Sequence, residues 1–160
     1  MTTSDPLRRI LDRYLESSEA HVSTEDAFAK LPAALRGRRP AGIEHSPWEI
    51  LEHLRITQHD ILEFCRNPKY KELDWPKDYW PAEHAPPTAG AGDASLKRYG
   101  EDLAELRAMA SDEGNDLFAR IPHGETQTYL RELLLVLDHT SYHVGQLVLI
   151  RQLLGAWPPK

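Results

Sequence analysis

Apolar residues recur every three or four positions along several stretches of the chain, whereas the alternating pattern of a β-strand is poorly represented. The helical spacing appears first near the N-terminus, where it predicts a helix over residues 4–18. A shorter helix is predicted over residues 23–31, because Pro32 follows it and cannot continue it. The apolar positions of the first helix are Leu7, Ile10, Leu11, Tyr14 and Leu15.

The clearest helix signals lie in residues 46–67. Ser46 is suited to the N-cap, Pro47 to the first helical position and Glu49 to the third, which completes a capping box. The helix is expected to end near Asn67, since a proline comes next. This is the second of the long helices that the pattern predicts.

Two more long helices are predicted in the second half of the chain. One spans residues 93–111, and the other begins after Thr126 or Thr128 and runs to Gly155, a residue type common just past helix ends. Residues 74–95 show no periodicity and are rich in proline, glycine and tryptophan. They predict a long loop, and loops of this length often act as functional lids.

These elements predict an all-α fold: a four-helix bundle with one extra short helix and a long loop between the second and third long helices. The chain has 160 residues, the size of one domain, so a single domain over residues 1–160 is expected. The cores of such bundles often hold metal sites, built from side chains on facing helices.

Composition narrows the classes of function. The formal net charge of −6 argues against nucleic acid as a partner, because binding to phosphates depends on lysine and arginine. Cys65 is the only cysteine, the N-terminus lacks the pattern of a secretory signal, and no run approaches about 18 consecutive apolar residues. We therefore expect a cytoplasmic protein that does not enter a membrane.

The apolar stretch LLLVLDHTSYHVGQLVLI, residues 133–150, contains two histidines one helical turn apart, His139 and His143. At about 100° per residue, both point away from the polar side of their helix and into the predicted bundle. The pair either binds a metal ion or consists of hydrogen-bonded core histidines. His53, at the border of the apolar face of the second long helix, could supply a third ligand. Three histidines from two helices, with one position left for water, are typical of a catalytic metal site.

Two further residues are candidates for catalysis. Glu49 lies one turn before His53 and could carry a proton, although the capping box already accounts for it. Gln146 follows His143 on the same face, where it could orient a ligand or accept a hydrogen bond from a histidine. In the long loop, Trp75, Tyr79 and Trp80 either close over the site or cap the end of the bundle.

His53 within SPWEILEHL, together with DHTSYHVGQL near the C-terminus, resembles the DinB-like superfamily of metal-binding four-helix bundles. The resemblance covers nearly the whole chain. It implies a divalent metal ion (zinc, nickel or iron) held by His53, His139 and His143, often within a homodimer. The last helix is apolar nearly all round, with Leu130, Leu134 and Val148 away from the histidine face. Such a helix needs burial on more than one side, which also favours a homodimer.

Members of this superfamily include S-transferases and isomerases that use a low-molecular-weight thiol, and proteins regarded as metal hydrolases. The leading hypothesis is accordingly a metal-dependent transferase or hydrolase that acts on a small molecule, with or without such a thiol. The alternative is a non-catalytic bundle that binds a metal or a small ligand in a stress response. A third hypothesis is a structural dimer whose histidines belong to the core.

Overall fold

The computed structural model describes residues 4–16 and 19–158, and within them it contains six α-helices and no strand. The expected all-α fold is confirmed. A single bridge joins the backbones of Arg120 and Thr128. The helices are α1 (Ser4–Glu16), α2 (Thr24–Phe28), α3 (Ala33–Arg36), α4 (Pro47–Arg66), α5 (Ala91–Ser111) and α6 (Tyr129–Leu153), with a short 3₁₀ turn η1 (Lys77–Tyr79) between α4 and α5.

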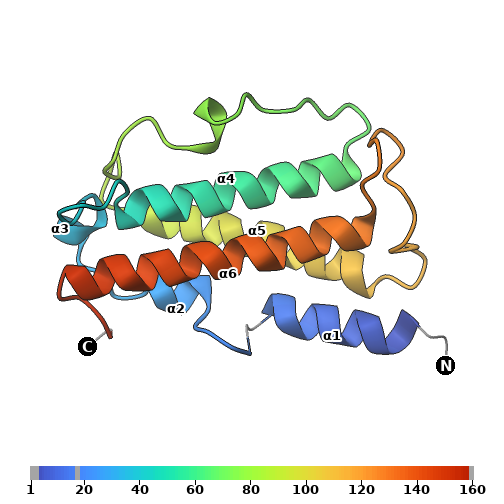
Figure 1. Cartoon of the computed structure of the whole chain (residues 1–160), viewed down its shortest axis with the longest axis horizontal. Coiled ribbons are helices and arrows are strands. Elements are labelled where there is room, and N and C mark those ends of the chain that lie inside the picture. The colour runs from blue at the N-terminus through green and yellow to red at the C-terminus, as the bar shows by residue number, and fades with distance from the viewer. Residues whose placement is uncertain (1–3, 17–18, 159–160) are drawn as a thin grey trace.

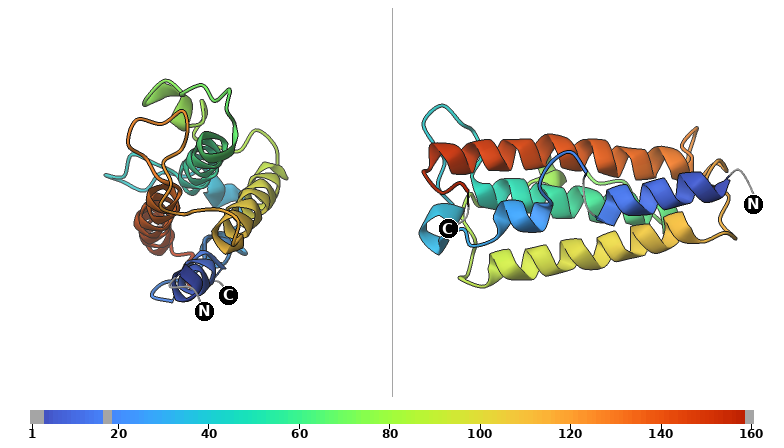
Figure 2. Two further views of the ribbon diagram at one scale, coloured as in Figure 1. Left: turned by 90° about the vertical axis from the view of Figure 1, so that its right-hand side faces the viewer. Right: turned by 90° about the horizontal axis from the view of Figure 1, so that it is seen from below.

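Four long helices, α1, α4, α5 and α6, lie side by side, and α4 contacts both α5 and α6 (Figures 1 and 2). α1 covers only one end of the molecule, and α2 continues its column toward the other end. The prediction of one extra short helix was wrong, because α3 is a second one. α3 has only four residues, too few for periodicity to reveal it, and begins after Pro32, whose fixed φ of −55° suits a helix start.

The long loop exists because α4 and α5 run in the same direction (Figure 1). A 20-residue helix is about 30 Å long, so the chain must travel back along the molecule before α5 can begin. Residues 67–90 make this return along the outer side of α4. The loop is therefore a crossover connection, and it passes close to the middle of α4.

The helix ends follow the predicted chemistry. The Ser46 hydroxyl accepts a hydrogen bond from the backbone N–H of Glu49, and the Glu49 carboxylate accepts one from the backbone N–H of Ser46, so the capping box is present. Thr128, and not Thr126, caps α6. Gly155 follows the end of α6 with a φ of +67°, a conformation that favours glycine.

Two clusters of buried apolar side chains fill the interior, one at each end of the helices. Arg151 lies beside the second cluster and is 1% exposed. Its guanidinium donates hydrogen bonds to the backbone carbonyls of Ala27, Ala29 and Ala156. Burial lowers the pKa of Arg151, and these three carbonyls compensate for the lost hydration. Arg151 thereby holds α2 and the C-terminal segment against α6.

By length and composition, α6 is the one described helix that could cross a membrane. The core helix of a soluble protein meets the same criterion, and α6 packs against α4, α2 and α1. It also carries His139, His143 and Arg151 in its interior face. About a third of its apolar span is buried against these helices, so length and composition by themselves do not make α6 a membrane span.

Candidate metal centre

Three histidines meet where α4 faces α6. His53 comes from α4 and is 2% exposed, and His143 comes from α6 and is 7% exposed. His139, one turn before His143, is half-buried. One ring nitrogen from each residue lies within 4.8 Å of the other two, and the Nε2 atoms of His53 and His139 are 3.0 Å apart. The set of residues that the sequence predicted as ligands is therefore brought together by the fold.

Hydrogen bonds fix which nitrogen of two of these rings can bind a metal. Nδ1 of His53 lies 2.8 Å from the carbonyl oxygen of Tyr79, which can only accept, so this nitrogen carries the proton. Nδ1 of His143 lies 2.7 Å from the side-chain oxygen of Gln146. In both rings the lone pair is left on Nε2. Partners of this kind orient the ligand histidines of metal sites, and the donor set fits a divalent metal ion.

Burial keeps the three imidazoles neutral. It lowers the pKa of His139 to about 3 and that of His143 to about 4, and the neighbouring rings add to both shifts. Burial also lowers the pKa of His53. Because a metal binds only the unprotonated nitrogen, all three side chains are ready to coordinate at neutral pH. Imidazole nitrogens suit zinc, nickel, iron and copper alike, so the set does not select one metal.

The crossover loop is attached to α4 at Asp60, two turns after His53 on the same face of the helix. The Asp60 carboxylate accepts hydrogen bonds from the hydroxyls of Tyr70, at 2.9 Å, and Tyr79, at 2.7 Å. Burial raises the pKa of both tyrosines, and the Asp60 carboxylate adds to this. Asp60 therefore positions the residue whose backbone carbonyl orients His53. Asp60 thus acts on His53 through the loop.

Trp80, the next residue of the loop, lies between two histidine rings. Its indole stacks on His53 and on His45, with ring centroids 4.0 Å apart in each case. His45 lies in a connector with no periodic relation to the ligands, so its position against Trp80 could not be read from the sequence. Trp75, by contrast, is 68% exposed. Of the three aromatic residues of the predicted lid, Trp80 covers a ligand, Tyr79 binds Asp60 and Trp75 faces solvent.

The two predicted catalytic residues have defined partners. Burial alone would raise the pKa of Glu49, but hydrogen bonds from Arg39 and Ser46 outweigh it and leave this pKa lowered. The Glu49 carboxylate is thus an ion-pair partner of Arg39 as well as a cap. Gln146 accepts a hydrogen bond from His143, one of the two roles expected for it. A catalytic role for either residue stays a prediction.

Other histidine, cysteine and arginine side chains are engaged in structural contacts. His59 pairs with Asp102 at 3.0 Å on the outer side of α4. Cys65 is buried, and burial raises the pKa of its thiol to about 12, so the thiol stays protonated and unreactive at neutral pH. In the basic segment 36–39, Arg36 and Arg39 form ion pairs with Asp93 and Glu49. These two arginines are therefore engaged within the chain.

A family model described as the DinB superfamily matches residues 18–147. The chain belongs to the DinB superfamily. The predicted relationship is therefore confirmed, and the matched region includes all three histidines. No curated protein and no solved structure matches the chain.

We expect the metal-free protein to lose stability as the pH falls from about 6.5 toward 4. The folded-state pKa values of His139 and His143, about 3 and 4, lie below the ordinary value of 6.5, so the unfolded chain takes up these protons first. The contribution of these neutral histidines to the free energy of unfolding is complete above pH 6.5 and is lost as the pH falls. Urea unfolding with a chelator present should show that the free energy of unfolding decreases by up to about 1.4 kcal/mol per pH unit for each of these histidines.

A His139→Leu variant separates this effect from the titration of carboxylates, because it removes one of the two groups and leaves the acids in place. Its free energy of unfolding should depend less steeply on pH than that of the wild type between pH 6.5 and 4.5. Identical slopes for the two proteins would show that His139 is not buried in its neutral form.

Replacing Asp60 by alanine should weaken metal binding by about 10- to 100-fold, the usual effect of losing an outer partner of a ligand. The variant frees Tyr79, so its carbonyl no longer orients His53. Zinc affinity is measured by competition with a chromophoric chelator. Asp102→Ala is the matched control, because it removes a carboxylate whose hydrogen-bond partner among the described residues is the outer His59. Equal zinc affinities for Asp60→Ala and wild type would contradict the role assigned to the loop.

Proposed function

We propose that this protein is a divalent-metal enzyme, a transferase or hydrolase for a small molecule, in which His53, His139 and His143 hold the metal ion. The observation that carries the proposal is the convergence of three ring nitrogens within 4.8 Å. The parallel course of α4 and α5, with a long crossover between them, supports a DinB-type four-helix bundle around this centre. We further propose that the protein acts in the cytoplasm.

The number of ligands supports catalysis over storage. Within residues 4–16 and 19–158, the group of close metal-binding side chains has three members. A site built for sequestration is expected to be closed by a fourth protein ligand, whereas catalytic sites keep a position for water or substrate. A three-histidine set therefore favours an open centre.

A bound divalent ion would polarise a substrate carbonyl or lower the pKa of a water molecule or a thiol, which provides a nucleophile at neutral pH. The chain's own residues prepare the site for this. Tyr79 and Gln146 hold two of the rings in the required tautomer, and Trp80 shields one face of His53 from water. Glu49 is the proposed proton carrier, although it would have to exchange its bond to Arg39 for one to the substrate.

The second candidate function is a non-catalytic protein that binds a metal or a small ligand. The extensive bonding of Glu49 favours it, because a carboxylate held by Arg39 and by the Ser46 backbone is poorly available for proton transfer. The two functions share the same metal site and differ only in turnover. Metal binding is therefore measured first and activity second.

Elemental analysis of untagged protein should find close to one divalent ion per chain, and His143→Ala should lose most of it because only two ligands remain. His59→Ala is the matched control: it removes a histidine from α4 that faces away from the site and pairs with Asp102, and it should keep its metal. If wild-type protein fails to take up zinc, nickel, iron or manganese, the three histidines are core residues and the proposed function is wrong.

Metal-loaded protein is then assayed for thiol transfer and for hydrolysis of small substrates. Glu49→Gln should lower turnover by about 10²- to 10⁴-fold, as loss of a proton carrier does, while metal content stays unchanged. Turnover that depends on metal and on Glu49 supports the enzyme. Metal binding without turnover in either assay favours the non-catalytic alternative.

We also propose that the protein forms a homodimer through the outer face of α6. Leu134, Tyr142, Leu149 and Leu153 are each about half or more exposed and share one side of this helix. Leu130 and Val148, which also suggested a dimer, pack instead within the chain. Sedimentation velocity should give a dimer for the wild type and a monomer for Leu149→Arg. A wild-type monomer at micromolar concentration would contradict the proposal.

A further inference from the structure

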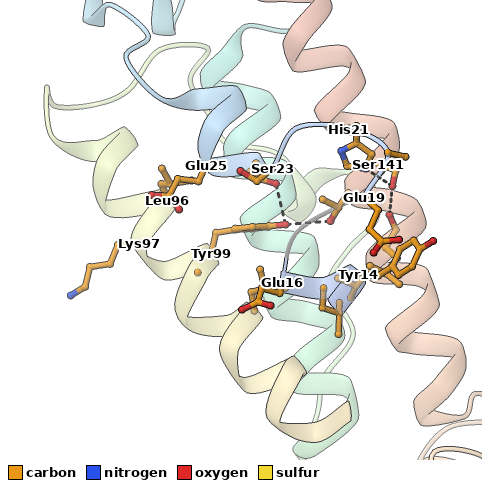
Figure 3. A pocket seen from close by; sticks show the side chains of 18 of the residues that line it. Tyr14, Glu16, Glu19, His21, Ser23, Glu25, Leu96, Lys97, Tyr99 and Ser141 are labelled. Carbon is orange, nitrogen blue, oxygen red and sulfur yellow. Dashed lines mark hydrogen bonds between the residues drawn. The ribbon is translucent and has the colours of Figure 1, made fainter. Parts of the chain in front are cut away.

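A second site lies where the column formed by α1 and α2 is interrupted. α1 ends at Glu16 and α2 begins at Thr24, so neither helix covers this part of α5 and α6. The gap leaves a cavity of about 490 Å³, within the range of 300–1,000 Å³ that is usual for small-molecule sites. Figure 3 shows side chains from α1, α2, α5 and α6 around it.

The walls of the cavity are mostly apolar, but its floor is a chain of hydroxyl groups. Leucine and valine side chains provide the walls: Leu15, Leu96, Leu103, Val136 and Leu137. On the floor, Thr24 donates a hydrogen bond to the Tyr99 hydroxyl at 3.2 Å, and that hydroxyl lies 3.3 Å from the hydroxyl of Thr140. Thr24 and Tyr99 are 4% and 5% exposed. Burial raises the pKa of Tyr99, so it stays an uncharged phenol.

Among the Asp, Glu, Lys and Arg side chains that line the cavity, four are acidic and one, Lys97, is basic. Glu16, Glu19, Glu25 and Asp93 all line it. Three of them pair with the arginines Arg107, Arg13 and Arg36, none of which belongs to the lining.

Three further lining residues are charged or titratable. The ring nitrogens of His21 lie 2.8 Å from the Val22 carbonyl oxygen and 2.9 Å from the Ser141 hydroxyl. The Glu25 carboxylate is exposed and forms no ion pair with another described residue. Lys97, the lysine of the lining, pairs with Glu101 and is 79% exposed, and Figure 3 shows it pointing away from the cavity. A ligand in the cavity therefore meets carboxylate and hydroxyl oxygens, which accept hydrogen bonds.

We propose that this cavity binds a small organic cation, an ammonium group attached to an apolar body. The apolar walls would bury the body, and the hydroxyl floor and acidic rim would accept the N–H groups of the ammonium. An organic carboxylate of the same size would be repelled by the rim. An alcohol of the same size would make the same contacts with the apolar walls but would lack the attraction between opposite charges.

The site is separate from the metal centre. The metal ligands come from the face of α6 that meets α4, whereas Thr140 and Val136 line the cavity on the neighbouring face, toward α5. Ligand binding should consequently persist in protein from which metal has been removed. A protein that binds no metal could therefore still bind the ligand, so the two proposals can fail independently.

The test compares three probes with one carbon skeleton: phenylbutylamine, phenylbutanol and phenylbutanoate. Isothermal titration calorimetry of the full chain at pH 7.5 should show the amine binding at least tenfold more tightly than the alcohol, with no binding of the carboxylate. The affinity for the amine should change less than threefold when a chelator removes metal, which excludes coordination of the amine nitrogen to the metal.

Gly100 provides a variant that blocks the cavity without disturbing the fold. It lines the cavity from α5, and a Cβ atom at this position would meet no heavy atom within 4 Å. Leucine also has a higher helix propensity than glycine, so Gly100→Leu should melt at the same temperature as wild type or higher. It should bind the amine at least tenfold more weakly. Ala94→Leu, which adds side-chain bulk on an exposed position of the same helix outside the cavity, should bind within twofold of wild type.

Three results would overturn the proposal. The first is absence of amine binding at millimolar concentration in the folded wild-type protein. The second is equal affinity for the amine and the alcohol, which would remove the role of charge. The third is unchanged affinity in Gly100→Leu, which would place the amine elsewhere on the protein.

Discussion

One hydrogen bond, from Nδ1 of the buried His53 to the backbone carbonyl of Tyr79, sets the orientation of a candidate metal ligand from the loop that passes along α4. It directs Nε2 of His53 toward α6, where the other two histidines lie. The bond depends on the position of Tyr79, which in turn depends on Asp60. The crossover loop, required by the parallel course of α4 and α5, therefore takes part in building the metal centre as well as connecting two helices.

The sequence was sufficient for the features that periodicity and local chemistry determine. The spacing of His139 and His143 placed both on the inner face of α6, and the capping box fixed the start of α4 and with it the register of His53. Because each of these predictions concerns one helix at a time, the face of each ligand could be read directly. Their convergence within 4.8 Å follows once α4 and α6 pack together.

The rest of the site depends on the path of the loop, which has no periodicity to read. The partner of His53 is a backbone carbonyl, and every residue has one, so residue types carry no information about it. Trp80 stacks between His45 and His53 only because the loop returns along α4. Asp60 alone left a usable signal, since it lies two turns from His53 on the same side of the helix. The cavity also escaped prediction, because it results from the meeting of α1, α2, α5 and α6.

The division of the fourth column into α1 and α2 has a consequence for how such a protein can diversify. All three candidate metal ligands belong to α4 and α6, whereas the walls of the cavity also come from α1, α2 and α5. Substitutions or length changes near the junction of α1 and α2 would reshape the cavity and leave the ligand histidines in place. The architecture thus separates the candidate metal centre from a neighbouring cavity whose walls can change independently of it.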